Sequence, residues 1–379
     1  MEAGDRGVGE RRQARIGRWA FGWALLWASQ AAPASAMPEV RAVLTRGDAG
    51  SSELVHYAPN ASGAILPERG RRVLHDPGAP PAALFLRDRA LVCVAREHRT
   101  DLWSLPYSEL PGELLISGVT PRLSPLVLED GTIVVSRTKA RVDRGTQLAA
   151  ERFSIAFATP KGIVEPYEVE AFFLWPFGAK GSTVYVLQID THGTRILAMN
   201  SLAKNSRAGP ELVADLGRSH VRDPVVTRDG LVVTERTESS AWISRIQRGV
   251  SRRSFEIKGA STLLGRPVGG DGELLVSISP AWDRGFLQVV GPRGAVTIEL
   301  PDGSPIPLAA EGTAAVVRVQ SQAGHRHFAL DVAGCGAKAC VGAPIELVAD
   351  GVLSSVQIAK AKRERTRARE AFGRFEDGE

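Results

Sequence analysis

Two Ser-x-x-Lys patterns are the first places where residue types and spacing could carry chemistry. They occur at Ser136–Lys139 and Ser201–Lys204. In acyl-transfer enzymes the serine of this pattern is a nucleophile, but it works together with further conserved elements that this chain lacks. The sequence also contains no Gly-x-Ser-x-Gly elbow of the kind that peptidases joined to a propeller require. We therefore predict no catalytic residues.

A histidine pair, His325-x-His327, would place two imidazoles on one side of a strand. Zinc sites need three or four protein ligands, and the sequence offers no third ligand beside this pair. No glycine-rich phosphate loop precedes a helix. We therefore predict neither a metal site nor a cofactor site.

The cysteines suggest a structural use. Cys335 and Cys340 enclose four mostly small residues. In an oxidising compartment a disulfide between them would close a short ring. Two free thiols in a loop remain the alternative. Cys93 lies within the apolar run Ala90–Ala95 and is expected to be a buried small hydrophobic residue.

The carboxylates that stand out belong to Asp-Gly pairs, which are expected to form structural turns. Asp-Gly supplies the positive φ angles that tight hairpin turns require. Each glycine follows a proline by five or six positions, and an apolar run follows each glycine. The pairs are Asp130-Gly131, Asp229-Gly230 and Asp271-Gly272, and Gly181 and Gly312 occupy equivalent positions.

These marked turns recur at intervals of roughly 40–50 residues, which is typical of β-propeller blades. The continuous apolar runs suit strands that are covered on both faces. Further hairpins follow each run, and Tyr185–Leu197 is the clearest of them. We predict an all-β propeller with six or seven four-stranded antiparallel blades. The earlier segments either form a seventh blade or complete the last one; they are Arg41–Thr45, Glu53–Tyr57, Gly63–Leu66 and Arg71–Leu74.

The Pro-x-x-x-x-Asp-Gly pattern followed by a strand resembles the PD40, or TolB-like, β-propeller repeat. Pro125 to Gly131 and Pro224 to Gly230 fit its frame. The Trp-Ser-Pro that the family places before Asp-Gly is absent from every copy. The resemblance covers roughly residues 80–347 and implies a propeller fold and an exported location. It does not imply a partner.

Residues 1–36 are typical of a signal peptide: a basic region of Arg11, Arg12, Arg15 and Arg18 precedes the apolar run Trp19–Ala28, and a small-residue cleavage site precedes Met37. An uncleaved anchor is the alternative. The mature chain contains no transmembrane segment by its hydropathy, so we expect a periplasmic or secreted protein. We assign residues 37–355 to the propeller and 356–379 to a charged, possibly helical tail.

Most of the formal charge of +5 lies in the two ends of the chain. No basic face with interleaved aromatic residues is evident, so we predict no nucleic-acid binding. We expect a non-catalytic scaffold that binds another protein or a cell-envelope component. The loop predicted at Lys139–Arg152 is the candidate for a binding surface. A hydrolase or lyase acting on a sugar or lactone at the channel mouth is the alternative.

Overall fold

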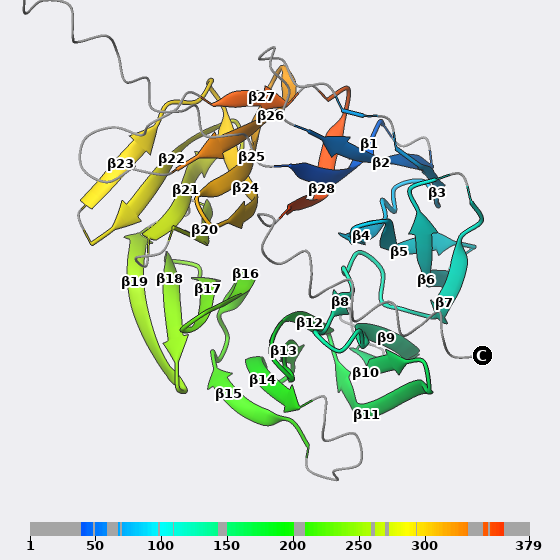
Figure 1. Cartoon of the computed structure of the whole chain (residues 1–379). Coiled ribbons are helices and arrows are strands. Elements are labelled where there is room, and N and C mark those ends of the chain that lie inside the picture. The colour runs from blue at the N-terminus through cyan, green and yellow to red at the C-terminus, as the bar shows by residue number, and fades with distance from the viewer. Residues whose placement is uncertain are drawn as a thin grey trace, which may run out of the picture. The chain divides into compact units, whose positions relative to one another are not determined.

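The computed structural model describes residues 39–47, 50–58, 67–68, 70–97, 99–108, 110–142, 150–200, 209–258, 262–269, 273–292, 294–332, 344–347 and 349–359. Within these residues, seven four-stranded antiparallel sheets form the blades of a propeller (Figure 1). The fold class predicted from the turn repeat is therefore confirmed, and the number of blades is seven.

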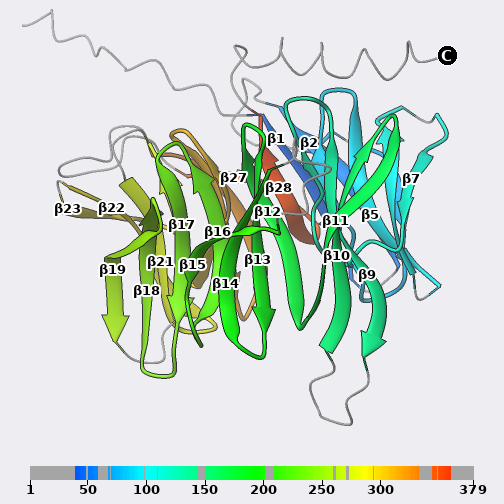
Figure 2. The same ribbon diagram turned by 90° about the horizontal axis from the view of Figure 1, so that it is seen from below.

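Six blades are each built from four consecutive strands, of which the first lies nearest the ring axis (Figure 1). Seen from the side, the strands of β12–β15 run along that axis (Figure 2). These blades comprise β4 (Ala82–Phe85), β5 (Arg89–Arg96), β6 (Arg99–Pro106), β7 (Glu113–Ser117); β8 (Leu126–Val127), β9 (Ile133–Val142), β10 (Ala150–Thr159), β11 (Gly162–Ala171); β12 (Phe173–Lys180), β13 (Thr183–Asp190), β14 (Gly193–Asn200), β15 (Glu211–Asp215); β16 (His220–Thr227), β17 (Gly230–Arg236), β18 (Ser240–Gln247), β19 (Val250–Lys258); β20 (Thr262–Val268), β21 (Glu273–Ala281), β22 (Arg284–Gly291), β23 (Gly294–Ile298); β24 (Ser304–Glu311), β25 (Ala314–Ser321), β26 (Gly324–Asp331), β27 (Ile345–Leu347).

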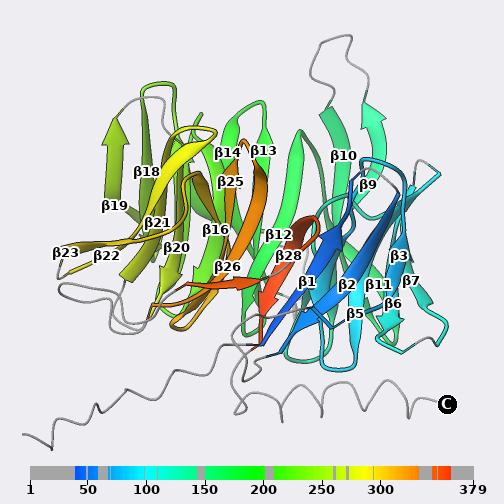
Figure 3. The same cartoon turned by 90° about the horizontal axis from the view of Figure 1, so that it is seen from above.

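The seventh blade joins the two ends of the propeller. Its strand order is β28 (Val352–Ile358), β1 (Val40–Thr45), β2 (Ser51–Tyr57) and β3 (Arg72–Leu74). The last strand lies beside the first (Figure 3), with Val40 opposite Ile358 and Thr45 opposite Val352. The early segments thus build a seventh blade, and the C-terminal strand completes it. Gly63–Leu66 lies outside the described residues, and the boundary drawn at residue 355 falls inside β28.

The hydrophobic core is divided into seven layers, one at each seam between neighbouring blades. In β17, for example, Val232 packs toward β20 and β21, whereas Val233 packs toward β13 and β14. In β25, Val316 and Val317 divide in the same way between two seams. Neighbouring side chains of a strand point to opposite faces, so both faces of these strands are buried. This arrangement explains the continuous apolar runs.

Four of the five prolines that precede the turn glycines lie inside innermost strands and do not begin them. Pro176, Pro224, Pro267 and Pro307 all have partners or neighbours within the ladders of β12, β16, β20 and β24. Proline lacks the backbone N–H, so it is tolerated at sheet edges and bulges. The innermost strand is an edge, and register shifts adjoin Pro176 and Pro307.

Several predictions concern parts of the chain that lie outside the described residues. These are the signal segment 1–36, residues 360–379 of the tail, and both Cys335 and Cys340. Among the residues that are described, no helix combines the length and hydropathy needed to cross a membrane.

Candidate functional site

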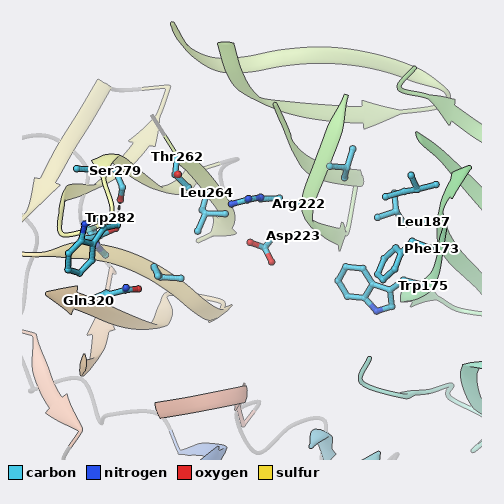
Figure 4. Close-up of a pocket in the computed structure, with 16 residues that line it drawn as sticks. Phe173, Trp175, Leu187, Arg222, Asp223, Thr262, Leu264, Ser279, Trp282 and Gln320 are labelled. Atoms are coloured by element: carbon cyan, nitrogen blue, oxygen red, sulfur yellow. Dashed lines mark hydrogen bonds between the residues drawn. The ribbon is translucent and has the colours of Figure 1, made fainter. Parts of the chain in front are cut away.

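A pocket of about 490 Å³ opens at one end of the ring (Figure 4). It spans four consecutive blades, because its lining comes from the first residues of β12, β16, β20 and β24 and from the last residues of β13, β21 and β25. Those innermost strands all begin at this end of the propeller. The pocket is therefore the place where side chains from separate repeats meet.

Aromatic side chains form two sides of the pocket. Phe173 and Trp175 lie on one side, whereas Trp282 lies on the other (Figure 4). The rings of Phe173 and Trp175 meet edge to face, with centroids 6.3 Å apart, a favourable geometry that holds both rings in place. Trp282 occupies the turn between β21 and β22, and 60% of it is exposed. One aromatic wall is thus fixed, and the other is presented to solvent.

Between these walls lie two charged residues of β16 (Figure 4). Asp223 forms an ion pair with Arg266, with 3.4 Å between Oδ1 and Nη2. Arg266 also donates from Nε to the carbonyl oxygen of Pro307 at 3.2 Å, so it links three blades. Arg222 is exposed and has no ion pair or hydrogen bond with the part of the chain that the structure describes. Its guanidinium is available to a ligand.

The backbone is strained at the same point. Asp223 has a φ of 45°, a conformation that is uncommon for residues other than glycine. The register of β16 against β17 shifts between Arg222 and Val225. Strained backbone of this kind tends to occur at functional sites. Here it coincides with the change of direction that places Arg222 and Asp223 in the pocket.

The pocket does not assemble an acid–base pair from the described residues. Ser304 Oγ donates to Ser279 Oγ at 2.6 Å, and both residues are buried. Activation of a serine requires an adjacent base, and the lining contains one carboxylate, Asp223, and no histidine. No group of three or more metal-ligating side chains occurs in the described part of the chain.

The predicted turn residues lie at the opposite end of the blades, between the first and second strands. Asp130 Oδ1 accepts from the Thr132 backbone N–H at 2.9 Å, and Gly131 has a φ of 82°. At Gly230, which follows the exposed turn residue Asp229, a Cβ would lie 2.2 Å from the Ile246 carbonyl oxygen. Asp271 and Gly272 lie outside the described residues.

The other candidate residues do not converge on the pocket. Ser136 is buried against Thr120, with 2.9 Å between their hydroxyl oxygens, whereas Lys139 pairs with Glu165. Ser201 and Lys204 lie outside the described residues. Cys93 is buried, and burial raises the pKa of its thiol to about 12, so it is unreactive.

The two ends of the Lys139–Arg152 segment are strand, so the prediction of a loop is wrong for residues 139–142 and 150–152, and residues 143–149 lie outside the described residues. β9 extends to Val142 and β10 begins at Ala150. Arg152 pairs with Glu168 at 3.6 Å. The many charges that suggested an exposed loop instead accompany a long hairpin, whose tip lies outside the described residues.

His325 and His327 occupy β26, in a different blade seam. His327 is 1% exposed, and its Nε2 accepts the backbone N–H of Leu353 at 3.2 Å. It therefore joins β26 to the closing strand β28. His325, two residues earlier in β26, is exposed to solvent.

Sequence reasoning missed the aromatic residues of the pocket and Arg222. The run Phe172–Phe177 contains the pattern of alternate aromatic residues that could have indicated them. Phe173, Trp175 and Phe177 share one face of β12, and their rings form a chain of contacts. Their meeting with Trp282 depends on the ring arrangement, which local patterns do not contain.

No family model matches the chain, and no curated protein matches it. Among solved structures, a puromycin-hydrolysing peptidase of Mycobacterium tuberculosis is 14% identical, with a TM-score of 0.53 over 86% of this chain and 55% of that one. A prolyl endopeptidase is 10% identical, with a TM-score of 0.52, and 86% and 51% of the two chains are covered. This chain thus spans about half the length of those peptidases.

A protein from Lactobacillus plantarum is 12% identical, with a TM-score of 0.53 over 86% of this chain and 99% of that one. TolB from Acinetobacter baumannii is a weaker match, at 10% identity and a TM-score of 0.46. At these identities the similarity establishes the fold alone. The chain therefore shares its fold with the two peptidases and the Lactobacillus plantarum protein, and the PD40 repeat stays a prediction.

Proposed function

We propose that this chain is an exported, non-catalytic β-propeller that binds a segment of another protein in the pocket at the ring's end. The observation that carries the proposal is the combination, in one concave site, of fixed aromatic residues, the exposed Trp282, and Arg222, which has no ion pair among the described residues. Tryptophan and arginine are enriched among the residues that dominate protein–protein binding energy.

The pocket has the features expected of the centre of such an interface. Phe173 and Trp175 are held by each other, so little side-chain freedom is lost when a partner binds. Arg222 offers a planar set of donors that suits a carboxylate or backbone carbonyl of the partner. Trp282 has apolar area to lose to the partner, because it is the most exposed of the three aromatic residues.

The hydrolase or lyase alternative lacks a specific observation in its favour. Two of the similar structures are peptidases by name, but this chain spans about half of their length. Hydrolysis in the pocket would need a base beside a nucleophile, and Asp223 is already paired with Arg266. We therefore propose binding without turnover.

A pair of arginine variants tests the proposal. Arg222→Ala removes a cation from the pocket, and Arg228→Ala removes one from the exposed turn at the other end of β16. Partners should be cross-linked to the mature protein in envelope extract and identified by mass spectrometry. Binding of the identified partner by purified protein should then be measured for each variant.

We expect Arg222→Ala and Trp282→Ala each to weaken binding by roughly thirtyfold to a thousandfold, because interface residues of these types contribute about 2–4 kcal/mol. Arg228→Ala should bind like the wild type. Equal binding by all variants would refute the pocket as the binding site. Turnover of a sugar or lactone that Arg222→Ala abolishes would favour the enzyme.

Export is tested separately. We expect the protein purified from its native cells to begin at Met37 and to fractionate with periplasmic or secreted proteins. A chain that retains residues 1–36 and sediments with membranes would show that the segment is an anchor.

A further inference from the structure

A group of basic side chains lies at the seam between β24–β27 and the closing blade. Arg318 on β25 is opposite His327 on β26, and Gln320 is opposite His325. Opposed residues of an antiparallel pair point to the same face of the sheet, with Cβ atoms about 5 Å apart. Arg318, His325 and His327 therefore form one cluster on the face that packs against β28, because His327 contacts Leu353 there.

Two donors in this cluster are buried and have no acceptor among the described residues. His327 Nε2 accepts the Leu353 N–H, so the ring proton of the neutral imidazole is on Nδ1. That Nδ1 is buried and has no hydrogen-bond partner. Nε of Arg318, which is always a donor, is also buried without a partner. An unsatisfied buried donor destabilises the folded protein, so an acceptor that bound both groups would stabilise it.

The positive charge of Arg318 is also uncompensated. No ion pair or hydrogen bond joins its side chain to the described residues, although the residue is partly buried. Burial lowers the pKa of Arg318. Burial and the nearby Arg318 both lower the pKa of His325. The guanidinium of Arg318 therefore opposes the addition of a proton to His325.

The cluster is open to solvent at one end. His327 is buried, Arg318 is intermediate and His325 is exposed. Gln320, on the same face of β25, also lines the pocket at the ring's end. Arg318 Nε and His327 Nδ1 themselves are fully buried, so an anion must enter beside His325 and shift the side chains of the cluster to reach them.

From this geometry we propose that Arg318, His325 and His327 form a binding site for a small oxyanion, a phosphate, sulfate or carboxylate group. The anion accepts hydrogen bonds from Arg318 Nε and His327 Nδ1 and neutralises the guanidinium. This site is separate from the proposed partner contact at Arg222, and its test does not depend on that function.

The test is thermal unfolding and calorimetric titration of the mature protein with sodium sulfate, phosphate or acetate. Sodium chloride at matched ionic strength in a zwitterionic buffer provides the reference. A ligand that binds only the folded state raises the melting temperature with its concentration. Stabilisation by sulfate and phosphate alone identifies a tetrahedral group, and stabilisation by acetate as well identifies a carboxylate source.

Arg318→Met is the main variant, and Arg326→Gln is its matched control. Arg326 is the neighbour of His325 and His327 on β26, but it is exposed and paired with Glu346 at 2.6 Å. We expect Arg318→Met to weaken anion affinity by roughly tenfold to a hundredfold, since hydrogen bonds to charged groups contribute about 1.5–3 kcal/mol. Arg326→Gln should keep the affinity of the wild type.

The anion-free protein gives a second, opposite readout. Replacing an uncompensated buried charge with an apolar side chain is neutral or stabilising, so Arg318→Met should melt at or above the wild-type temperature without anions. His325→Gln, a change at an exposed position, should weaken anion binding and provides the test if Arg318→Met fails to fold. Equal anion stabilisation of wild type, Arg318→Met and His325→Gln would overturn the proposal, as would the absence of any effect beyond chloride.

Discussion

Two innermost strands of the propeller, β12 and β28, reach the same position in their blades by different means. β12 continues through a tight turn at Gly181 into its partner β13. β28 has its partner, β1, at the other end of the chain. Backbone amides flanking the seams of β28 are instead bound by side chains: Ala83 N–H by Ser355, Phe85 N–H by Gln357, and Leu353 N–H by His327.

Polar side-chain bonds cross both seams of the closing strand, which no turn joins to its partner. Ser355 and Gln357 bind the blade that follows β28, at 3.0 and 2.9 Å, whereas His327 belongs to the blade before it. A strand without a short connection is held in register by its neighbours on either side.

The largest effect is expected from removing the closing strand. A chain ending at residue 351 loses β28, including the fully buried Leu353, and exposes the edge of β1. We expect loss of the cooperative thermal transition. The control is a chain ending at residue 359, which keeps every described strand and should unfold like the full chain. Equal transitions for both truncations would show that closure does not stabilise the ring.

A matched pair of leucines measures packing in the two strands. Leu353 in β28 and Leu174 in β12 are both 0% exposed. Each Leu→Ala change should lower the free energy of unfolding by about 2–5 kcal/mol. In addition, Leu353→Ala should make the β28 amides exchange faster than global unfolding alone allows, because no turn tethers that strand and it can open locally. Identical exchange patterns would remove the distinction between the two strands.

The pH dependence of stability tests the His327 bond. Burial, aided by Arg318 and His325, lowers the pKa of His327 to about 4. Between pH 6.5 and 4 the unfolded chain binds a proton that the folded chain does not. The free energy of unfolding should therefore decrease as the pH is lowered through this window, by roughly 3 kcal/mol in total.

Urea unfolding at pH 7 and pH 4.5 checks this slope in buffers free of oxyanions. His327→Gln should lose the contribution, so the difference between wild type and variant should shrink as the pH falls. His192→Gln, a change at an exposed turn residue, should leave the slope as in the wild type. A constant difference across the window would contradict a neutral, buried His327.

The smallest effect concerns a single side-chain bond. Gln357→Ala leaves the Phe85 amide without its acceptor and should cost about 1–2 kcal/mol of unfolding free energy. Gln322, which is exposed and bonded to Asp283 at 3.2 Å, provides the control; its replacement by alanine should cost no more than about 0.5 kcal/mol. A smaller effect at Gln357 than at Gln322 would argue against side-chain bonds as the substitute for a turn.

The fold could be predicted because each blade repeats the same local chemistry. Gly131 and Gly230 mark turns whose backbone angles favour glycine, and the apolar runs that follow them are buried on both faces. The number of blades could not be predicted, because the closing blade depends on pairing between Val40 and Ile358. No local pattern distinguishes a strand that completes a distant blade from one that begins its own.

The pocket could not be predicted for a related reason. Arg222, Trp175 and Trp282 belong to three different blades, and each looks like an ordinary strand or turn residue in its own segment. The histidine pair shows the same limit. The spacing correctly predicts that both residues lie on one strand, but the partner of His327 is the backbone of Leu353 in another blade.

The pairing of β1 with β28 also sets an order of events during protein synthesis. β1 emerges among the first residues, and its partner leaves the ribosome about 300 residues later. At roughly 5–20 residues per second, the free edge of β1 waits for about 15–60 s. An unpaired strand edge is a template for association with other chains. The seam at β1 therefore stays open until β28 has been made.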